Sequence, residues 1–228
     1  MTNVPILEAR KLELSYGDTR ALRGASLQLT AGERVALMGP SGSGKSSLLH
    51  CLAGIIRPDR GEVMMEGARL DTLSESARSS RRLARIGVVF QFGDLVPELT
   101  LVENVMLPLQ LLGRKKREAR AAAMDLLDSL DIGGVANQRA GGVSGGQVQR
   151  AAVARALVHR PSIVLADEPT GSLDTVSAEM VLDAMVSLVA QIGAVMLVVT
   201  HDNLVAAHLD RHVVMRDGAL AHAVEASG

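Results

Sequence analysis

The sequence contains very few aromatic residues, one cysteine and almost no net charge. Tyrosine occurs once and phenylalanine twice in 228 residues, and tryptophan is absent. The single Cys51 excludes an internal disulfide and suits a reducing compartment; its place in a predicted helix favours a small core residue over a reactive thiol. The formal net charge of −1 provides no basic footprint, so we expect no nucleic-acid partner.

Long apolar runs and a leader are also missing. Residues 1–4 do not begin a charged-then-apolar leader, so we expect no secretion. The longest apolar runs, such as 194–199, fall well short of the roughly 18 residues that span a bilayer. We therefore expect a soluble, cytoplasmic chain, and 228 residues with 47% hydrophobic content fit one domain over 1–228.

Lysine is rare as well, and the exceptions are informative. Of 24 basic residues only Lys11, Lys45, Lys115 and Lys116 are lysines, and the others are arginines. Lys45 lies in a glycine-rich loop, where a broad planar guanidinium would not replace a compact ammonium. The choice of lysine at this position indicates chemistry rather than packing.

The segment 39–46 has the form G-x-x-x-x-G-K-S and directly follows the apolar run 35–38. Its glycines let backbone N–H groups turn around phosphates without Cβ clashes, and the helix that begins at Lys45 points its positive end at the same anion. Lys45 can reach the β- and γ-phosphates, and the Ser46 hydroxyl can bind the accompanying Mg²⁺. The predicted nucleotide-binding residues here are Gly39, Pro40, Ser41, Gly42, Ser43, Gly44, Lys45, Ser46 and Ser47.

Patterns outside this loop predict an α/β chain. Runs over 6–14 and 21–29 predict an antiparallel hairpin, and a last hairpin turns at Asp217-Gly218. Strands separated by helices favour a parallel sheet covered on both faces. The predicted strands are 35–38, 62–66, 86–90, 163–166 and 195–199, and the predicted helices are 45–54, 74–84, 144–158 and 175–191.

Residues 95–143 are predicted to form an inserted all-helical lobe. Thr100-Leu101-Val102-Glu103 is a capping box that opens a helix towards Gly113. Residues 114–130 continue as a second helix, with Met124, Leu127 and Leu130 on one face.

Two adjacent carboxylates follow the apolar strand 163–166. At the carboxyl end of a strand beside a phosphate loop, Asp167 can hold Mg²⁺ and Glu168 can orient or deprotonate the attacking water. An ordinary acidic loop after a strand commonly has one carboxylate, but it is a poor explanation for two at this position.

The segment Ser144-Gly145-Gly146-Gln147 predicts a second anion site. Ser144 can cap a helix whose first residues are glycines, so bare backbone N–H groups face outward. Since one loop already binds a nucleotide, we expect this helix end to reach the γ-phosphate held by a second copy of the chain. The alternative is a helix start made small for packing.

This ordered series of motifs resembles the ATP-binding cassette (ABC) family over essentially the whole chain. The matching segments are Walker A at 39–46, the Q-loop glutamine Gln91, the signature motif 144–147, Walker B at 163–168, the D-loop 172–174 and the switch histidine His201. One departure is Val143, where the family usually has leucine; it does not touch the phosphate contacts.

The resemblance implies a P-loop NTPase core of the ABC type, with an antiparallel β subdomain and an inserted α-helical subdomain. It implies a head-to-tail homodimer with two ATP molecules between Walker A of one subunit and the signature motif of the other. Gln91 would bind Mg²⁺ and sense a membrane partner, Asp174 would cross the dimer seam, and His201 would contact the γ-phosphate. Tyr16, 23 residues before Gly39, lies where the adenine-stacking aromatic of the family would fall.

The functional class follows from what the chain does not contain between its motifs. Only 99 positions separate Lys45 from Ser144, which leaves no room for the long coiled coil of chromosome-type cassettes, and translation-type members carry two cassettes in one chain. The segments 91–113 and 168–174 resemble the macrolide-exporter and lipoprotein-release branch. An ATPase subunit that lies on the inner face of the cell membrane against a separate permease is therefore expected. An amino-acid importer ATPase and a soluble cassette ATPase remain as alternatives.

Overall fold

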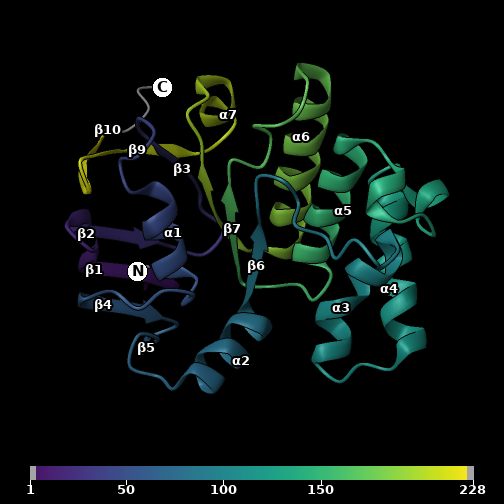
Figure 1. Cartoon of the computed structure of the whole chain (residues 1–228), viewed down its shortest axis with the longest axis horizontal. Coiled ribbons are helices and arrows are strands. Elements are labelled where there is room, and N and C mark those ends of the chain that lie inside the picture. The colour runs from purple at the N-terminus through teal and green to yellow at the C-terminus, as the bar shows by residue number, and fades with distance from the viewer. Residues whose placement is uncertain (1–3, 225–228) are drawn as a thin grey trace. The chain divides into compact units, whose positions relative to one another are not determined.

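The computed structural model describes residues 4–224, so residues 1–3, on which the expectation of no leader partly depends, lie outside it. The chain divides into two compact units. Figure 1 labels the helices and strands along the chain. Unit 1 consists of residues 1–82 and 193–228, and unit 2 consists of residues 83–192. Each unit is described by itself.

Unit 1 contains a four-stranded antiparallel sheet in the order β2-β1-β4-β5. Its strands are β1 Leu7–Tyr16, β2 Thr19–Leu29, β4 Arg60–Met65 and β5 Ala68–Arg69. The predicted hairpin is confirmed: β1 and β2 pair antiparallel, and Tyr16 faces Thr19 across a turn in which Gly17 has φ +57°. The very short β5 has no sequence signal and was not predicted.

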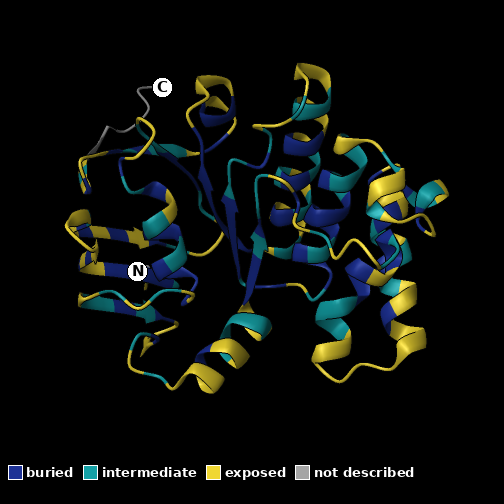
Figure 2. Cartoon of the chain, viewed as in Figure 1, coloured by how far each residue is buried: buried dark blue, intermediate teal, exposed yellow. Residues whose placement is uncertain are grey.

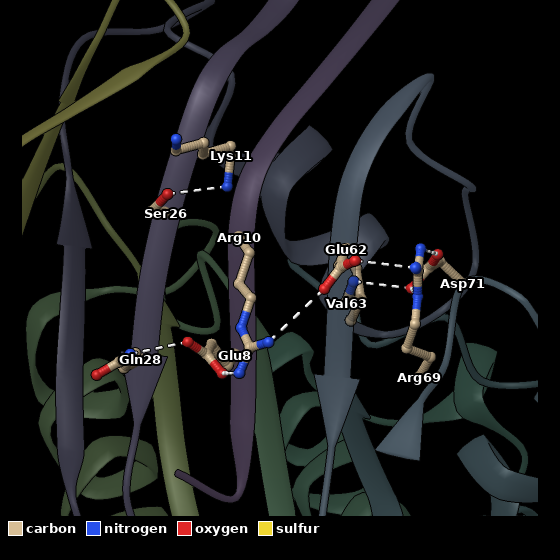
Figure 3. Close-up of polar contacts among 9 residues, drawn as sticks. All are labelled: Glu8, Arg10, Lys11, Ser26, Gln28, Glu62, Val63, Arg69 and Asp71. Atoms are coloured by element: carbon tan, nitrogen blue, oxygen red, sulfur yellow. Dashed lines mark hydrogen bonds and ion pairs between the residues drawn. The ribbon is translucent and has the colours of Figure 1, made fainter. Parts of the chain in front are cut away.

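Polar contacts on this sheet follow the strand register (Figure 3). Gln28 lies opposite Glu8 and donates to its carboxylate at 2.8 Å, and Arg10 lies opposite Glu62 with 3.6 Å between their charged atoms. A hydrogen bond from Arg10 lowers the pKa of Glu8. Directly opposed partners of this kind stabilise one register over a slipped one.

Unit 1 also holds the strands that position the phosphate loop. β3 Arg34–Met38 pairs in parallel with both β8 Val195–Val199 and β9 Arg211–Arg216, and β10 Ala219–Val224 returns antiparallel to β9. Every residue of β8 is buried, as expected of a parallel strand covered on both faces. The helices are α1 Lys45–Leu52, α2 Glu75–Arg85, which continues into unit 2, and the unpredicted α7 Asn203–Ala207.

Unit 2 combines two parallel strands with four helices. β6 Ile86–Val89 pairs with β7 Ile163–Asp167, and both strands are largely buried (Figure 2). The helices are α3 Leu101–Leu111, α4 Lys116–Ser129, α5 Gly145–Leu157 and α6 Thr175–Ile192, with short 3-10 turns at Gly133–Val135 and Ala140–Gly142.

The helices predicted within 95–143 are present, with one shifted boundary. The Thr100 capping box is confirmed, since Thr100 Oγ1 accepts from Glu103 N and Glu103 accepts from Thr100 N. α4 begins two residues later than predicted, at Lys116, because Lys115 before it keeps an extended backbone with φ −62° and ψ 141°. α3 and α4 share one apolar core with Ala151, Ala154 and Val158 at α5, so a separate subdomain over 95–143 stays a prediction.

Among the described residues 4–224, one helix is long and apolar enough to span a membrane by length and composition alone. This helix, α6, has a mean hydropathy of 1.4 over 18 residues. The sequence analysis predicted this helix over 175–191 but did not count it as a membrane-spanning candidate, because it considered only uninterrupted apolar runs and α6 contains Glu179 and Asp183 among apolar residues. A core helix passes the same test, and α6 buries Val181, Leu182, Met185 and Val189 on one face.

Candidate functional site

The segment 39–46 forms a tight loop between β3 and α1, and its glycines are required by geometry. Gly39, Gly42 and Gly44 have φ values of +146°, +76° and +104°. A Cβ on Gly39 would lie 2.2 Å from the carbonyl oxygen of Met215, and one on Gly44 would lie 2.3 Å from that of Ala21. The loop therefore closes against neighbouring backbone in a way that only glycine permits.

This loop has the chemistry of an anion site. α1 begins at Lys45 with no side-chain cap and no acidic residue in its first turn, so its amide dipoles stay available to an anion. The Lys45 ammonium is buried and donates to the carbonyl oxygens of Gly39 at 2.8 Å and Pro40 at 2.9 Å. Ser43 Oγ is buried without a hydrogen-bond partner, which marks a polar group that a bound phosphate would satisfy.

Unit 1 brings His201, the predicted switch histidine, to the same sheet edge as the loop. β3 and β8 are parallel neighbours, and Thr200 N donates to Leu37 O at 3.1 Å just before His201. His201 is exposed there, and Tyr16, at the end of β1, is 50% exposed. Ser46 is exposed and Ser47 half-buried in the first turn of α1.

Unit 2 brings Gln91 and Glu168 together. They follow the parallel neighbours β6 and β7, and a Cβ on Gly171 would lie 3.2 Å from both Gln91 Nε2 and Glu168 Oε2. Asp167 is the last residue of β7. Glu168 has φ +44°, the left-handed conformation that is unusual for a non-glycine residue and concentrates at functional sites.

The start of α5 is built as predicted and adds one detail. Ser144 Oγ accepts from Gln147 N at 3.3 Å, and Gln147 Oε1 accepts from Ser144 N at 2.9 Å. The side-chain oxygen of Gln147 is therefore committed to the cap, which leaves its Nε2 for a ligand. Ser144 and Gly145 are exposed, so this first turn is accessible from outside the unit.

Asp174 caps α6 in the structure. Its carboxylate accepts from Ser177 N at 3.0 Å and Ser177 Oγ at 2.7 Å, and these hydrogen bonds lower its pKa. The first turns of α5 and α6 are close, because a Cβ on Gly146 would lie 3.4 Å from Ser177 Oγ. The expected role of Asp174 at a dimer seam stays a prediction.

Two features of the molecule lie outside this site. Burial raises the pKa of Cys51 to about 12, in agreement with the prediction that it is a core residue and not a reactive thiol. A cavity of about 1040 Å³ in unit 1 is lined by the antiparallel sheet, β9 and β10, and by none of the loop residues 39–47. Its carboxylates Glu8 and Glu62 are paired with arginines (Figure 3).

Comparison with known proteins defines the class. The family description "ABC transporter" matches residues 22–171, and the chain belongs to this family. Two dimeric structures of the ATP-binding cassette MJ0796, one of them in a post-hydrolysis state bound to ADP and Pi, each have a TM-score of 0.91. The ADP-bound one is 34% identical, and the match covers 97% of this chain and 99% of that chain.

Curated relatives indicate the branch of the family. The lipoprotein-releasing system ATP-binding protein LolD 2 of Caulobacter vibrioides is 45% identical over 220 residues, which are 95% of this chain and 96% of the relative. LolD of Legionella pneumophila (strain Lens) is 40% identical over 94% of this chain and 96% of the relative. These matches confirm the predicted resemblance and the ABC-type fold. The chain is an ATP-binding and ATP-hydrolysing subunit that powers a membrane ABC transporter.

Proposed function

We propose that the chain acts as half of a head-to-tail dimer that powers a lipoprotein-releasing permease from the inner face of the cell membrane. The observation that carries the choice of cargo is the 40–45% identity to lipoprotein-release ATPases over nearly the whole chain. The two dimeric cassette structures support the self-association.

On this proposal the residues 39–47 bind the phosphates of ATP, with Lys45 leaving its loop carbonyls for the β- and γ-phosphates. Tyr16 stacks on the adenine. Mg²⁺, held by Ser46, Gln91 and Asp167, would neutralise charge on the phosphates. These residues include a single carboxylate, which suits Mg²⁺ because it usually binds through one or two carboxylates and the phosphates of the substrate.

Glu168 orients the attacking water and removes its proton, and His201 contacts the γ-phosphate. Gln91 links this centre to the permease. The left-handed backbone of Glu168 supports a functional role, since such a conformation costs free energy that packing alone does not require. Ser144, Gly145, Gly146 and Gln147 complete the site of the partner copy, and Asp174 lies at the seam.

The catalytic assignment is tested by Glu168→Gln. We expect it to abolish ATP turnover and to preserve ATP binding, because the water loses its base while Lys45 and the loop amides remain. Gel filtration with ATP and Mg²⁺ should then show a trapped dimer. Glu179→Gln, on the exposed face of α6, is the matched control and should hydrolyse ATP normally. A Glu168→Gln protein with wild-type turnover, or one that stays monomeric with ATP, contradicts the assignment.

The permease contact is tested at Phe92 and Leu95, which lie just after Gln91. Phe92 is 69% exposed and Leu95 half-buried. Replacing both by serine should leave ATP binding intact and abolish complex formation in membranes, because a small apolar contact contributes only about 25 cal/mol per Å². Pull-down of the permease at wild-type yield would count against this docking site. A wild-type protein that brings down no membrane protein would favour a soluble ATPase instead.

A further inference from the structure

The loop over residues 90–94, which contains Gln91, is held through its backbone. Gln149 Nε2 donates to Phe90 O at 3.0 Å, and Ser172 Oγ donates to Gln91 O at 3.3 Å. Arg155 donates from Nη2 to Gly93 O and from Nη1 to Asp94 O, both at 2.7 Å. Four carbonyl groups of this short loop thus accept hydrogen bonds from side chains distant in the sequence.

Two of the three donors, Gln149 and Arg155, lie on α5, and neither is freely solvated. Gln149 is 2% exposed, and Arg155 is half-buried. Burial lowers the pKa of the Arg155 guanidinium, and the nearby charge of Asp94 acts in the opposite direction. A buried amide or guanidinium that loses its acceptors is strongly disfavoured, so the loop and the helix are expected to stay joined.

Packing ties the same two elements together. Gly93 has φ +75°, and a Cβ there would lie 3.0 Å from Val148 Cγ1 and 3.4 Å from Gln149 Oε1. The loop backbone therefore lies directly on α5, which itself packs beside β6 (Figure 1). The contact leaves the Phe92 side chain exposed to a partner.

The other end of α5 carries the signature motif, with Ser144 as its cap and Gln147 in its first turn. We propose that Gln149 and Arg155 are positioning residues that make the 90–94 loop and the first turn of α5 move as one body. A load applied at Phe92 then displaces Ser144 together with Gln91. This inference rests on the proposed roles of Gln91 and Ser144.

The same helix provides a matched control. Arg150 Nη1 donates to Leu130 O at 3.1 Å, so it is also a partly buried arginine of α5 bound to a backbone carbonyl. This hydrogen bond joins α5 to the end of α4 and does not involve the 90–94 loop. A variant without Arg150 therefore shows how the loss of one arginine–carbonyl hydrogen bond on α5 affects the fold, without any change at the 90–94 loop.

The first experiment measures amide hydrogen exchange of the full chain without nucleotide. Arg155→Met and Gln149→Met should each speed exchange at residues 90–94 by about tenfold, and Arg155→Lys should restore part of the protection. Arg150→Met should leave that exchange unchanged. Equal exchange at 90–94 in the wild type and both methionine variants overturns the inference. Since no ATP is present, this arm is independent of the proposed catalysis.

The second experiment is a double-mutant cycle on the ATPase rate of the full chain. Arg155→Met should lower kcat about tenfold with little change in KM for ATP, and by less than twofold when Gln91→Ala is already present. A merely structural residue would lower kcat by the same factor in both backgrounds, and that result overturns the inference. Wild-type turnover by Glu168→Gln would instead overturn the proposed function, with the exchange result left standing.

Discussion

The Nζ atom of Lys45 lies 2.8 Å from the carbonyl oxygen of Gly39, so the ammonium is bonded to its own loop in the structure. To bind a phosphate, the Lys45 ammonium must give up its hydrogen bonds to these backbone carbonyls. The binding free energy of ATP is therefore a difference between two sets of hydrogen bonds to the same ammonium.

Lys45→Met should weaken ATP binding by about 10–100-fold, the usual worth of a hydrogen bond to a charged group. Lys45→Arg should not restore binding, because the guanidinium is too broad for the loop. Titration calorimetry measures both, with the exposed Lys116→Met as control. Wild-type affinity in Lys45→Met would remove this lysine from the site.

Alanine substitutions at two loop glycines should differ sharply in cost. Gly39→Ala places a Cβ 2.2 Å from Met215 O and should reduce the free energy of unfolding by more than about 2 kcal/mol. Gly42→Ala meets no atom within 4 Å and carries only the left-handed backbone penalty, about 1 kcal/mol. Urea unfolding without nucleotide compares the two variants, and equal costs would show that the close approach at Gly39 is absent.

Tyr16→Ala should weaken ATP binding by about 1–2 kcal/mol, since one stacked base is lost. Tyr16→Phe keeps the ring and should bind nearly normally. Because Tyr16 is half exposed, neither change should lower the free energy of unfolding much. If calorimetry finds the same affinity for ATP in the wild type and in Tyr16→Ala, Tyr16 does not stack on the adenine and its role is structural.

Lowering the pH should weaken the ion pair between Arg34, at the start of β3, and Asp210, just before β9. A hydrogen bond from Arg34 at 2.6 Å lowers the pKa of Asp210, so its stabilisation is present above the ordinary pKa near 3.9 and is lost as pH falls through the lower folded value. Asp210→Asn should cost up to about 1 kcal/mol at pH 7, because the pair is partly exposed and screened. Chemical unfolding at pH 7 and pH 2.5 should show this difference shrinking, and a constant difference would contradict the linkage.

The sequence predicted most elements because their signals are local. The run 195–199, the Ser144 cap and the Thr100 capping box each depend on a few adjacent residues, and all three are present. The five-residue α7 has too few turns for a periodic pattern, although Asp202 caps it.

Sequence motifs predicted the residues of the candidate site, but they did not predict the contacts that hold those residues in place. Spacing located Lys45 and Glu168, but the bonds from Gln149 and Arg155 to the 90–94 loop join residues about 60 positions apart and have no local pattern. The available signal was that Gln149 and Arg155 stand among the alanine and valine residues of the helix 145–157, where buried polar side chains need specific partners. Gln147 was assigned to the nucleotide alone, although the spacing Ser144-x-x-Gln147 is itself a capping-box signal, and the structure shows that its oxygen completes the helix cap.

The donors that hold the 90–94 loop bind main-chain oxygens, which every amino acid possesses. On the proposed docking role of Phe92, a substitution of its side chain would alter what the loop presents to a permease without removing any acceptor of Gln149, Ser172 or Arg155. On this proposal, the side chain that contacts a partner can change in sequence while the main-chain hydrogen bonds beneath it stay the same.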